Sequence, residues 1–338
     1  MPSTPYPSAG DWNRELSKPQ DHDAALPIVQ KDARILCLSR PNDPANARLY
    51  QEQAERIIGI GTKREDFDWT ALAKNPPTVV FVSTGGIRDL LAEVLTTFAT
   101  SIQWVHAKMA GIEHCTSPTL SQSEVVMTNA KGHFSSTLAE YGMMACSYFA
   151  KDLPRLLKQK ANANWEKYNV LELRGATLGI IGYGDIGQAT ARLAKAYGMN
   201  VMALKRKRKS KTENGDNNND NNNKKRKLEE EDENGATIYY SSENPNALND
   251  ICAASDYIYV STPLTPQTKG MIGKEQFNKM KSTGVIINVG RGPVIDEEAL
   301  IEALKDGKIK GAALDVTSTE PLPKESPLWG LDNVLLSP

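Results

Sequence analysis

The stretch Leu178-Gly179-Ile180-Ile181-Gly182-Tyr183-Gly184-Asp185-Ile186-Gly187 decides the fold. An apolar run is followed at once by three glycines in the spacing G-x-G-x-x-G, and residues 186–197 continue with helical periodicity. In such a unit the first glycine allows a tight turn, the second admits a pyrophosphate, and the third lets helix and strand pack closely. The free N–H groups of the helix N-terminus attract the anion. The stretch therefore predicts a dinucleotide-binding Rossmann unit, with the coenzyme against Gly182, Tyr183, Gly184, Asp185, Ile186 and Gly187.

Apolar runs on both sides of this motif repeat the alternation of short strand and helix. The later series has runs at 178–181, 201–204, 257–260, 285–288, 312–314 and 334–336. Six strands of this kind make a complete doubly wound parallel sheet. The earlier series has runs at 35–38, 79–82, 104–105 and 125–127, with helices at 47–57 and 89–98. We therefore expect an α/β protein of two domains, 31–130 and 131–338, connected by a helix over 136–159.

Two segments lack the apolar residues that a core needs. Residues 1–30 are rich in proline and polar side chains, and residues 207–235 consist almost entirely of charged residues and asparagines. Such compositions cannot offset the entropy of ordering by burial. We expect the first segment to be a disordered tail and the second a disordered insert between strands.

The charges of the chain nearly cancel, with 40 lysines and arginines against 41 aspartates and glutamates. This balance makes nucleic acid an unexpected partner, and no apolar stretch reaches the roughly twenty residues of a membrane span. The chain has four cysteines that form no C-x-x-C pair: Cys37, Cys115, Cys146 and Cys252. Scattered cysteines are typical of a reducing compartment and give neither a disulfide framework nor a metal site. We therefore expect a cytoplasmic protein without a metal ion.

The residues about twenty positions past the glycine motif indicate which coenzyme is bound. An acid at this place accepts hydrogen bonds from the adenosine ribose and repels a 2′-phosphate, whereas a cation can pair with that phosphate. Lys205 and Arg206 hold the place here. We therefore favour NADP. The alternative is NAD, which applies if Lys205 and Arg206 only begin the solvated insert and do not contact the coenzyme.

From Gln103 to the end, the chain resembles the D-isomer-specific 2-hydroxyacid dehydrogenases, the family that includes glyoxylate/hydroxypyruvate reductases and phosphoglycerate dehydrogenase. Beside the glycine turn, the matching segments are 104–113, 138–141, 261–265, 288–292, 313–316 and 320–322. The region 34–98 fits the flavodoxin-like substrate domain of the family in pattern only. The resemblance implies an NAD(P)-dependent enzyme that interconverts small 2-keto and 2-hydroxy acids.

The resemblance also assigns roles at the substrate. Arg291 matches the cation that holds the substrate carboxylate and polarises its carbonyl, as a guanidinium fork can do. Ala110 and Gly111 match the loop whose backbone N–H groups share that carboxylate. Glu320 matches the acid that orients a catalytic histidine and raises its pKa.

Further matches concern the coenzyme. Thr262 and Pro263 correspond to the turn beside the nicotinamide ribose, Val289 lies in the matching segment before Arg291, and Asp315 corresponds to the residue near the nicotinamide. Without this pattern, such polar residues after strands are ordinarily solvated surface groups.

The histidine of the family follows a Ser-Pro pair at the end of the last Rossmann strand. The printed chain ends at Ser337-Pro338, and its four histidines, His22, His106, His114 and His133, lie elsewhere. A positioned acid contributes on the order of a hundred- to ten-thousandfold in rate. We therefore expect the chain as printed to be a poor catalyst and to represent a truncated record of an enzyme.

Two functions from different classes fit these features. The first is a reductase of a small 2-keto acid, which we expect to be a homodimer because the connector region of relatives forms a dimer interface. The second is a regulatory member like the nuclear corepressors of the family, because the basic blocks 205–211 and 224–227 resemble a bipartite nuclear import signal. We prefer the first, since such charge runs more often only keep a loop soluble.

Overall fold

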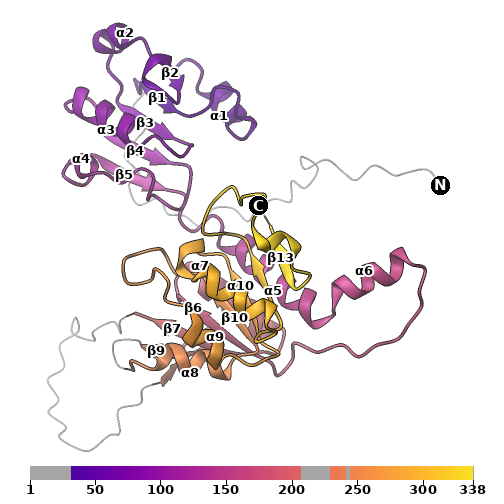
Figure 1. Ribbon diagram of the computed structural model, residues 1–338. Coiled ribbons are helices and arrows are strands. Elements are labelled where there is room, and N and C mark those ends of the chain that lie inside the picture. The colour runs from indigo at the N-terminus through magenta and orange to yellow at the C-terminus, as the bar shows by residue number, and fades with distance from the viewer. Residues whose placement is uncertain (1–31, 207–228, 241–243, 338) are drawn as a thin grey trace, which may run out of the picture. The chain divides into compact units, whose positions relative to one another are not determined.

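The computed structural model describes residues 32–206, 229–240 and 244–337. The chain divides between Lys131 and Gly132 into two compact units (Figure 1), one residue from the division that the sequence predicts. The predicted tail and most of the predicted insert lie outside the described residues. Both units are built on parallel sheets with helices, so the predicted α/β class is confirmed.

The first unit holds a five-stranded sheet in the order β2-β1-β3-β4-β5, and all neighbouring strands are parallel. This is the strand order of flavodoxin-like folds. Its strands are β1 (Ile35–Leu38), β2 (Ile57–Gly61), β3 (Val79–Val82), β4 (Trp104–Ala107) and β5 (Val126–Asn129). Its helices are α1 (Ala47–Glu52), α2 (Trp69–Lys74), α3 (Arg88–Thr97) and α4 (Pro118–Ser121).

Strand β2 corrects the sequence prediction of a helix over 47–57. The helix ends at Glu52, and Ile57 already belongs to the sheet, where it pairs with Ile35 of β1. A side chain at Gly59 would lie 3.0 Å from Leu36 Cδ1, so the glycine allows β2 to pack closely against the core. The β-branched residues around it favour the extended strand.

The sheet of the first unit is held by a continuous apolar core. Leu36, Val80 and Val105 are fully buried in the strands, and Leu91 and Val94 of α3 pack against them. Each such side chain stabilises the fold by about 1.5–3 kcal/mol when fully buried. The core fixes the loops that follow β1, β3 and β4 at one edge of the sheet.

The second unit holds an eight-stranded sheet in the order β13-β12-β11-β10-β6-β7-β9-β8, in which every pairing except that of β8 with β9 is parallel. Its strands are β6 (Thr177–Ile181), β7 (Asn200–Lys205), β8 (Glu229–Glu231), β9 (Thr237–Tyr240), β10 (Tyr257–Val260), β11 (Val285–Asn288), β12 (Gly311–Leu314) and β13 (Val334–Leu336). The chain runs from β6 to β7 on one side and returns to β10 on the other. The coenzyme crevice of such a sheet lies at the carboxyl ends of these strands.

Helices cover both faces of this sheet (Figure 1). The helices are α5 (Ser135–Ala150), α6 (Leu153–Ala161), α7 (Asp185–Ala196), α8 (Ala247–Ala254), α9 (Lys274–Lys279) and α10 (Glu297–Lys305). One apolar cluster joins α5 and α7 to the first face, and a second joins α8, α9 and α10 to the other. Among the described residues, no helix combines the length and the apolar character needed to cross a bilayer.

Helix α5 approaches the sheet closely at its centre. A side chain at Gly142 would lie 2.5 Å from Tyr259 Cε2, and the buried Tyr259 hydroxyl donates to the Leu138 carbonyl at 2.9 Å. The hydrogen bond satisfies a buried polar group that would otherwise cost about 1–3 kcal/mol. The contact locks α5 onto the middle of the sheet.

The insert differs from its prediction at its carboxyl end. Residues 229–235 were expected to be disordered, but β8 and the turn that follows it form a hairpin with β9. The Asp232 carboxylate closes this turn by accepting the N–H groups of Asn234 and Ala236, both at 3.0 Å. All six predicted strands are present, and β8 and β9 are additions to them, so the sheet has eight strands and the predicted number of six is wrong.

The predicted connector helix over 136–159 is two helices, α5 and α6. Asp152 between them takes a left-handed backbone conformation with φ 49°, and Pro154 lies in the first turn of α6. A proline has no N–H to continue the hydrogen bonds of the preceding helix. The break turns α6 away from the sheet (Figure 1).

Candidate coenzyme and substrate site

The three glycines of the motif have three different surroundings. Gly182 has φ 99°, and a side chain there would lie 2.6 Å from Thr262 Oγ1. A side chain at Gly187 would lie 2.5 Å from the Gly182 carbonyl oxygen. At Gly184, by contrast, a side chain would meet nothing within 4 Å.

The fold itself therefore requires Gly182 and Gly187, whereas the open space at Gly184 fits the approach of a ligand. Gly184 is the N-cap of α7, so the first N–H groups of this helix face that space. Helix N-termini bind phosphate through such groups and through the helix dipole. The cradle fits the pyrophosphate of a dinucleotide.

The turn at Thr262 and Pro263 is tied to the glycine turn. The Thr262 hydroxyl donates to the Ile181 carbonyl at 2.8 Å, and the Ser261 hydroxyl donates to the Gly182 carbonyl at 2.7 Å. These bonds join the ends of β6 and β10, the two strands between which the direction of winding reverses. The predicted coenzyme residues of the two strands thus form one rigid edge.

Lys205 and Tyr183 meet beside this edge. The Lys205 ammonium lies over the Tyr183 ring, 5.3 Å from its centroid, as in a cation–π contact. The Tyr183 hydroxyl donates to Asp232 Oδ2 at 2.7 Å, which connects the glycine turn to the β8–β9 hairpin. Arg206 directly follows β7.

Burial and hydrogen bonding around Tyr183 shift two pKa values. Burial raises the pKa of the Tyr183 hydroxyl, and the neighbouring Asp232 adds to the effect. Burial also acts to raise the pKa of Asp232, but hydrogen bonds from Ala236, Tyr183 and Asn234 outweigh it and lower that pKa. Sequence analysis missed Asp232, because an acid in a charged segment gives no signal that it will return to the glycine turn.

Arg291 lies in a loop that is fixed on both sides. A side chain at Gly290 would lie 2.7 Å from the Thr262 carbonyl oxygen, and one at Gly292 would overlap the Thr317 carbonyl. Asn288 spans the loop, because its amide donates to the Arg291 carbonyl at 3.1 Å and accepts the Gly290 N–H at 3.0 Å. The half-buried Arg291 side chain donates to the Gly290 carbonyl at 2.7 Å. Val289 is buried in this loop.

Two acids follow β12 at the same edge of the sheet. Asp315 accepts the Ser337 hydroxyl at 3.1 Å, and exposed Glu320 accepts the Thr317 N–H at 3.1 Å. Burial raises the pKa of Asp315; the Ser337 hydrogen bond opposes this shift and the charge of Glu320 adds to it. The Tyr141 hydroxyl of α5 is buried beside Ser337 and Asp315, and burial raises its pKa.

The carboxyl edge of the second sheet thus brings together the glycine turn, the Thr262 turn, the Arg291 loop and both acids. Ala110 and Gly111 belong to the first unit, where they follow β4, and Asn129 donates to the Ala110 carbonyl at 2.7 Å. Within the described parts of the chain, no three His, Cys, Asp or Glu side chains cluster so that they could hold a metal ion. The basic blocks beyond Arg206 lie outside those parts.

Comparisons with known proteins agree with this geometry. Residues 143–338 match the family model described as D-isomer specific 2-hydroxyacid dehydrogenase, NAD binding domain. A D-3-phosphoglycerate dehydrogenase of Methanocaldococcus jannaschii is 34% identical over 296 residues, which cover 86% of this chain and 50% of that protein. The glyoxylate reductase/hydroxypyruvate reductase of Homo sapiens is 30% identical over 250 residues, which cover 72% of this chain and 69% of that protein.

A solved structure shows the same fold. The D-isomer specific 2-hydroxyacid dehydrogenase from Xanthobacter autotrophicus Py2, in complex with NADPH and MES, aligns with a TM-score of 0.67 and 23% identity over 91% of this chain and 88% of that chain. The chain spans about half the length of the M. jannaschii relative. The family model nevertheless covers more than half of this chain, including the glycine turn, Arg291 and Glu320. The chain therefore belongs to the D-isomer specific 2-hydroxyacid dehydrogenase family.

Proposed function

We propose that the protein reduces a small 2-keto acid, such as glyoxylate or hydroxypyruvate, to the D-2-hydroxy acid with a nicotinamide coenzyme. One observation carries the proposal: the glycine turn with its open cradle and the fixed Arg291 loop lie at the same edge of one sheet, where Gly182 and Gly290 both pack closely against Thr262. The bound coenzyme would supply the hydride. The residues of the chain would bind and orient both reactants.

Arg291 is the proposed catalytic cation. Its guanidinium would bind the substrate carboxylate and polarise the keto oxygen, and the close contacts of Gly290 and Gly292 hold its loop in place without substrate. In the first unit, the backbone N–H groups of Ala110 and Gly111 are proposed donors to a substrate carboxylate. This preorganisation means that little reorganisation is needed when charge develops on the oxygen.

Glu320 is the proposed partner of the proton donor. In the family the donor directly follows a Ser-Pro pair. Ser337 hydrogen bonds to Asp315, whose pKa is raised by burial and, to a smaller extent, by the charge of Glu320. An imidazole placed beside Ser337 would therefore lie close to both acids. Neighbouring carboxylates favour the charged imidazole and keep the donor protonated.

NADP is the proposed coenzyme. The Tyr183 ring holds the Lys205 ammonium at the end of β7, where a cation favours a 2′-phosphate and where NAD-specific sites place an acid. The double variant Lys205→Asp with Arg206→Ser should reverse the ratio of NADPH to NADH affinity in a fluorescence titration. An unchanged ratio would leave NAD as the better assignment.

We propose that the protein acts as a cytoplasmic homodimer through the arm formed by α6 and the segment up to Leu171. Leu156 and Leu157 are exposed on α6, and Trp165 is 96% exposed. The arm extends away from the sheet of its unit (Figure 1), and the exposure of these three side chains shows that the unit leaves them largely uncovered. A second copy of the arm would cover them. The corepressor alternative gains no support, because the relatives described above are named as enzymes.

The proposed activity is tested with the purified protein, NADPH, and glyoxylate or hydroxypyruvate. Consumption of NADPH that depends on the keto acid is the expected result. Arg291→Lys keeps the charge but removes the fork, and should lower kcat/KM about a hundredfold. Arg48→Lys, an exposed arginine of α1, is the matched control. If the parent protein reduces no 2-keto acid, the proposal is wrong.

A further inference from the structure

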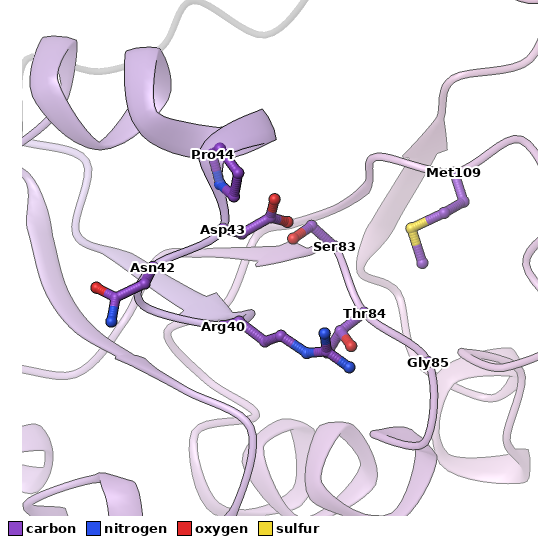
Figure 2. A pocket seen from close by; sticks show the side chains of 8 residues that line it. All are labelled: Arg40, Asn42, Asp43, Pro44, Ser83, Thr84, Gly85 and Met109. Atoms are coloured by element: carbon purple, nitrogen blue, oxygen red, sulfur yellow. The ribbon is translucent and has the colours of Figure 1, made fainter.

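The first unit contains a cavity of about 390 Å³, lined by the loops after β1, β3 and β4 (Figure 2). Arg40 and Met109 line it, and Met109 directly precedes Ala110 of the proposed substrate loop. The cavity therefore belongs to the proposed substrate site. A contact that neither the glycine motif nor the proposed reaction accounts for lies in the second unit, where the β8–β9 hairpin meets the glycine turn.

Tyr183 makes this contact from within the glycine turn. The pyrophosphate cradle uses the glycines and the N–H groups of α7, so it needs no particular side chain at position 183. The Tyr183 side chain is nevertheless only 4% exposed, and it packs in the apolar cluster that includes Ala203 of β7 and Ala236 directly before β9. Since β7 lies between β6 and β9 in the sheet, this side chain spans β7 to reach the hairpin.

The turn that receives the Tyr183 hydroxyl is itself fixed. Asp232 Oδ1 accepts the two backbone N–H groups that close the turn. Its second oxygen, Oδ2, accepts the Tyr183 hydroxyl at 2.7 Å and the Asn234 amide at 3.1 Å. The Asn234 amide oxygen accepts Arg192 of α7 at 3.3 Å. The turn therefore contacts α7 and presents a carboxylate oxygen to the tyrosine.

The other side of the tyrosine contacts Lys205, whose ammonium lies 5.3 Å from the centroid of the ring. Lys205 ends β7, and the period of two places it on the same face of the sheet as Ala203. A lysine has a flexible four-carbon stem and loses much rotamer freedom when it is fixed. A contact that already fixes the ammonium lowers this cost when a phosphate binds. The hydrogen bond to Asp232 polarises the phenol, which makes the ring a better acceptor for the cation.

We propose that the β8–β9 hairpin positions the cation at the adenosine end of the coenzyme site, with Asp232 as a positioning residue that acts through Tyr183 on Lys205. The hydrogen bond fixes the phenol, and the ring holds the ammonium ready for the 2′-phosphate of NADP. The inference rests on the proposed NADP preference and adds to it a residue from outside the glycine motif and β7. It also opposes simple electrostatics, because an acid near a phosphate site should by itself weaken binding.

Two adenosine ligands without nicotinamide isolate this end of the site. Adenosine 2′,5′-bisphosphate and 5′-AMP differ only by the 2′-phosphate, and calorimetry on the purified protein gives the ratio of their affinities. The parent protein should bind the bisphosphate about ten- to a hundredfold more tightly. Asp232→Asn should lower this ratio about two- to fivefold and leave the Kd of 5′-AMP unchanged. The reason is that the amide nitrogen in place of Oδ2 cannot accept the Tyr183 hydroxyl.

The sign of the change separates positioning from a plain charge effect. If Asp232 acted only as a nearby negative charge, Asp232→Asn would raise the ratio. Tyr183→Phe breaks the same hydrogen bond and keeps the carboxylate, so it should lower the ratio as well. Asp250→Asn, at an exposed acid of α8, is the matched control and should not change it. In a Lys205→Met background neither variant should lower the ratio further, a coupling that a merely structural role of the hairpin would not produce.

Three results would overturn the positioning role of Asp232. If the ratio is unchanged or raised in Asp232→Asn, or falls equally with and without Lys205, the positioning role is excluded and the NADP assignment stands. If the parent protein binds both adenosine ligands equally, the positioning role and the NADP assignment are both wrong. These measurements require no turnover, so the proposed reduction of 2-keto acids is tested separately.

Discussion

The substitution Gly184→Ala separates coenzyme binding from folding. Gly184 has φ −90°, which alanine adopts without strain, and the added methyl group would meet no protein atom within 4 Å. The cost to folding is limited to the loss of a glycine N-cap, about 1 kcal/mol or less. For a unit of this size, the melting temperature should fall by no more than about 2–4 °C.

The methyl group would occupy the space through which a pyrophosphate reaches the first N–H groups of α7. Losing one hydrogen bond to a charged phosphate costs about 1.5–3 kcal/mol, which corresponds to about a ten- to hundredfold weaker Kd. We expect calorimetry with NADPH and NADH to show this loss for both coenzymes. The nicotinamide end is not involved, so the loss should not depend on the keto acid.

Gly182→Ala is the control with the opposite behaviour. Its φ of 99° costs alanine about 1–3 kcal/mol, and the methyl group would lie 2.6 Å from Thr262 Oγ1, which adds about 1–3 kcal/mol of overpacking. The melting temperature should therefore fall on the order of 10 °C. Parental coenzyme affinity in well-folded Gly184→Ala, or equal destabilisation of the two variants, would refute the reasoning.

Three other perturbations test separate parts of the structure. Because the pKa of Asp315 is raised in the folded state, the parent protein loses stability as the pH rises through that pKa. The variant Asp315→Asn should therefore have the melting temperature of the parent below about pH 4 and a higher one at neutral pH. A lower melting temperature of the variant at neutral pH would contradict this expectation. Tyr183→Phe removes a donor to Asp232 and should cost about 1–2 kcal/mol in denaturant unfolding, with no comparable cost for exposed Tyr197→Phe. The lowered pKa of Asp232 in the folded state stabilises the fold at pH values above the pKa of this carboxyl in the unfolded chain. On acidification, Tyr183→Phe should therefore unfold at a higher pH than the parent protein. An acid transition at the same pH in both proteins would argue against the Tyr183–Asp232 hydrogen bond. Leu157→Glu should give the mass of a monomer in light scattering, whereas the control Tyr197→Glu should keep the mass of a dimer. A dimer that persists in Leu157→Glu would exclude the arm as the interface.

The sequence predicts the local geometry of the glycine turn better than it predicts all the strands. Gly182, Gly184 and Gly187 have the three surroundings expected of them, because the chemistry of a G-x-G-x-x-G turn is local. The strands β2 and β9 were missed for the opposite reason. A four- or five-residue apolar run beside polar sequence resembles the end of a helix or a loop until its pairing partner is known.

Other features depend on contacts between distant residues and leave no local pattern. Asp232 returns to Tyr183 from within a charged segment, and Asn46 joins loops from three strands. Arg40 follows a strand as many solvated arginines do, and only the fold places it at a cavity. Polar residues of this kind are indistinguishable from surface groups in a single sequence.

The antiparallel direction of β8 determines where the charged segment is attached. Strand β7 ends at Lys205 on the carboxyl edge of the sheet, and β8 begins at Glu229 on the same edge, because it runs opposite to β9 and β9 runs parallel to β7. The described chain therefore leaves the sheet after β7 and returns to it at β8 on the same edge, the one that carries the glycine turn. A fluorophore coupled to a cysteine at position 206, directly after β7, would lie at this edge, and a change in its emission should report nucleotide occupancy.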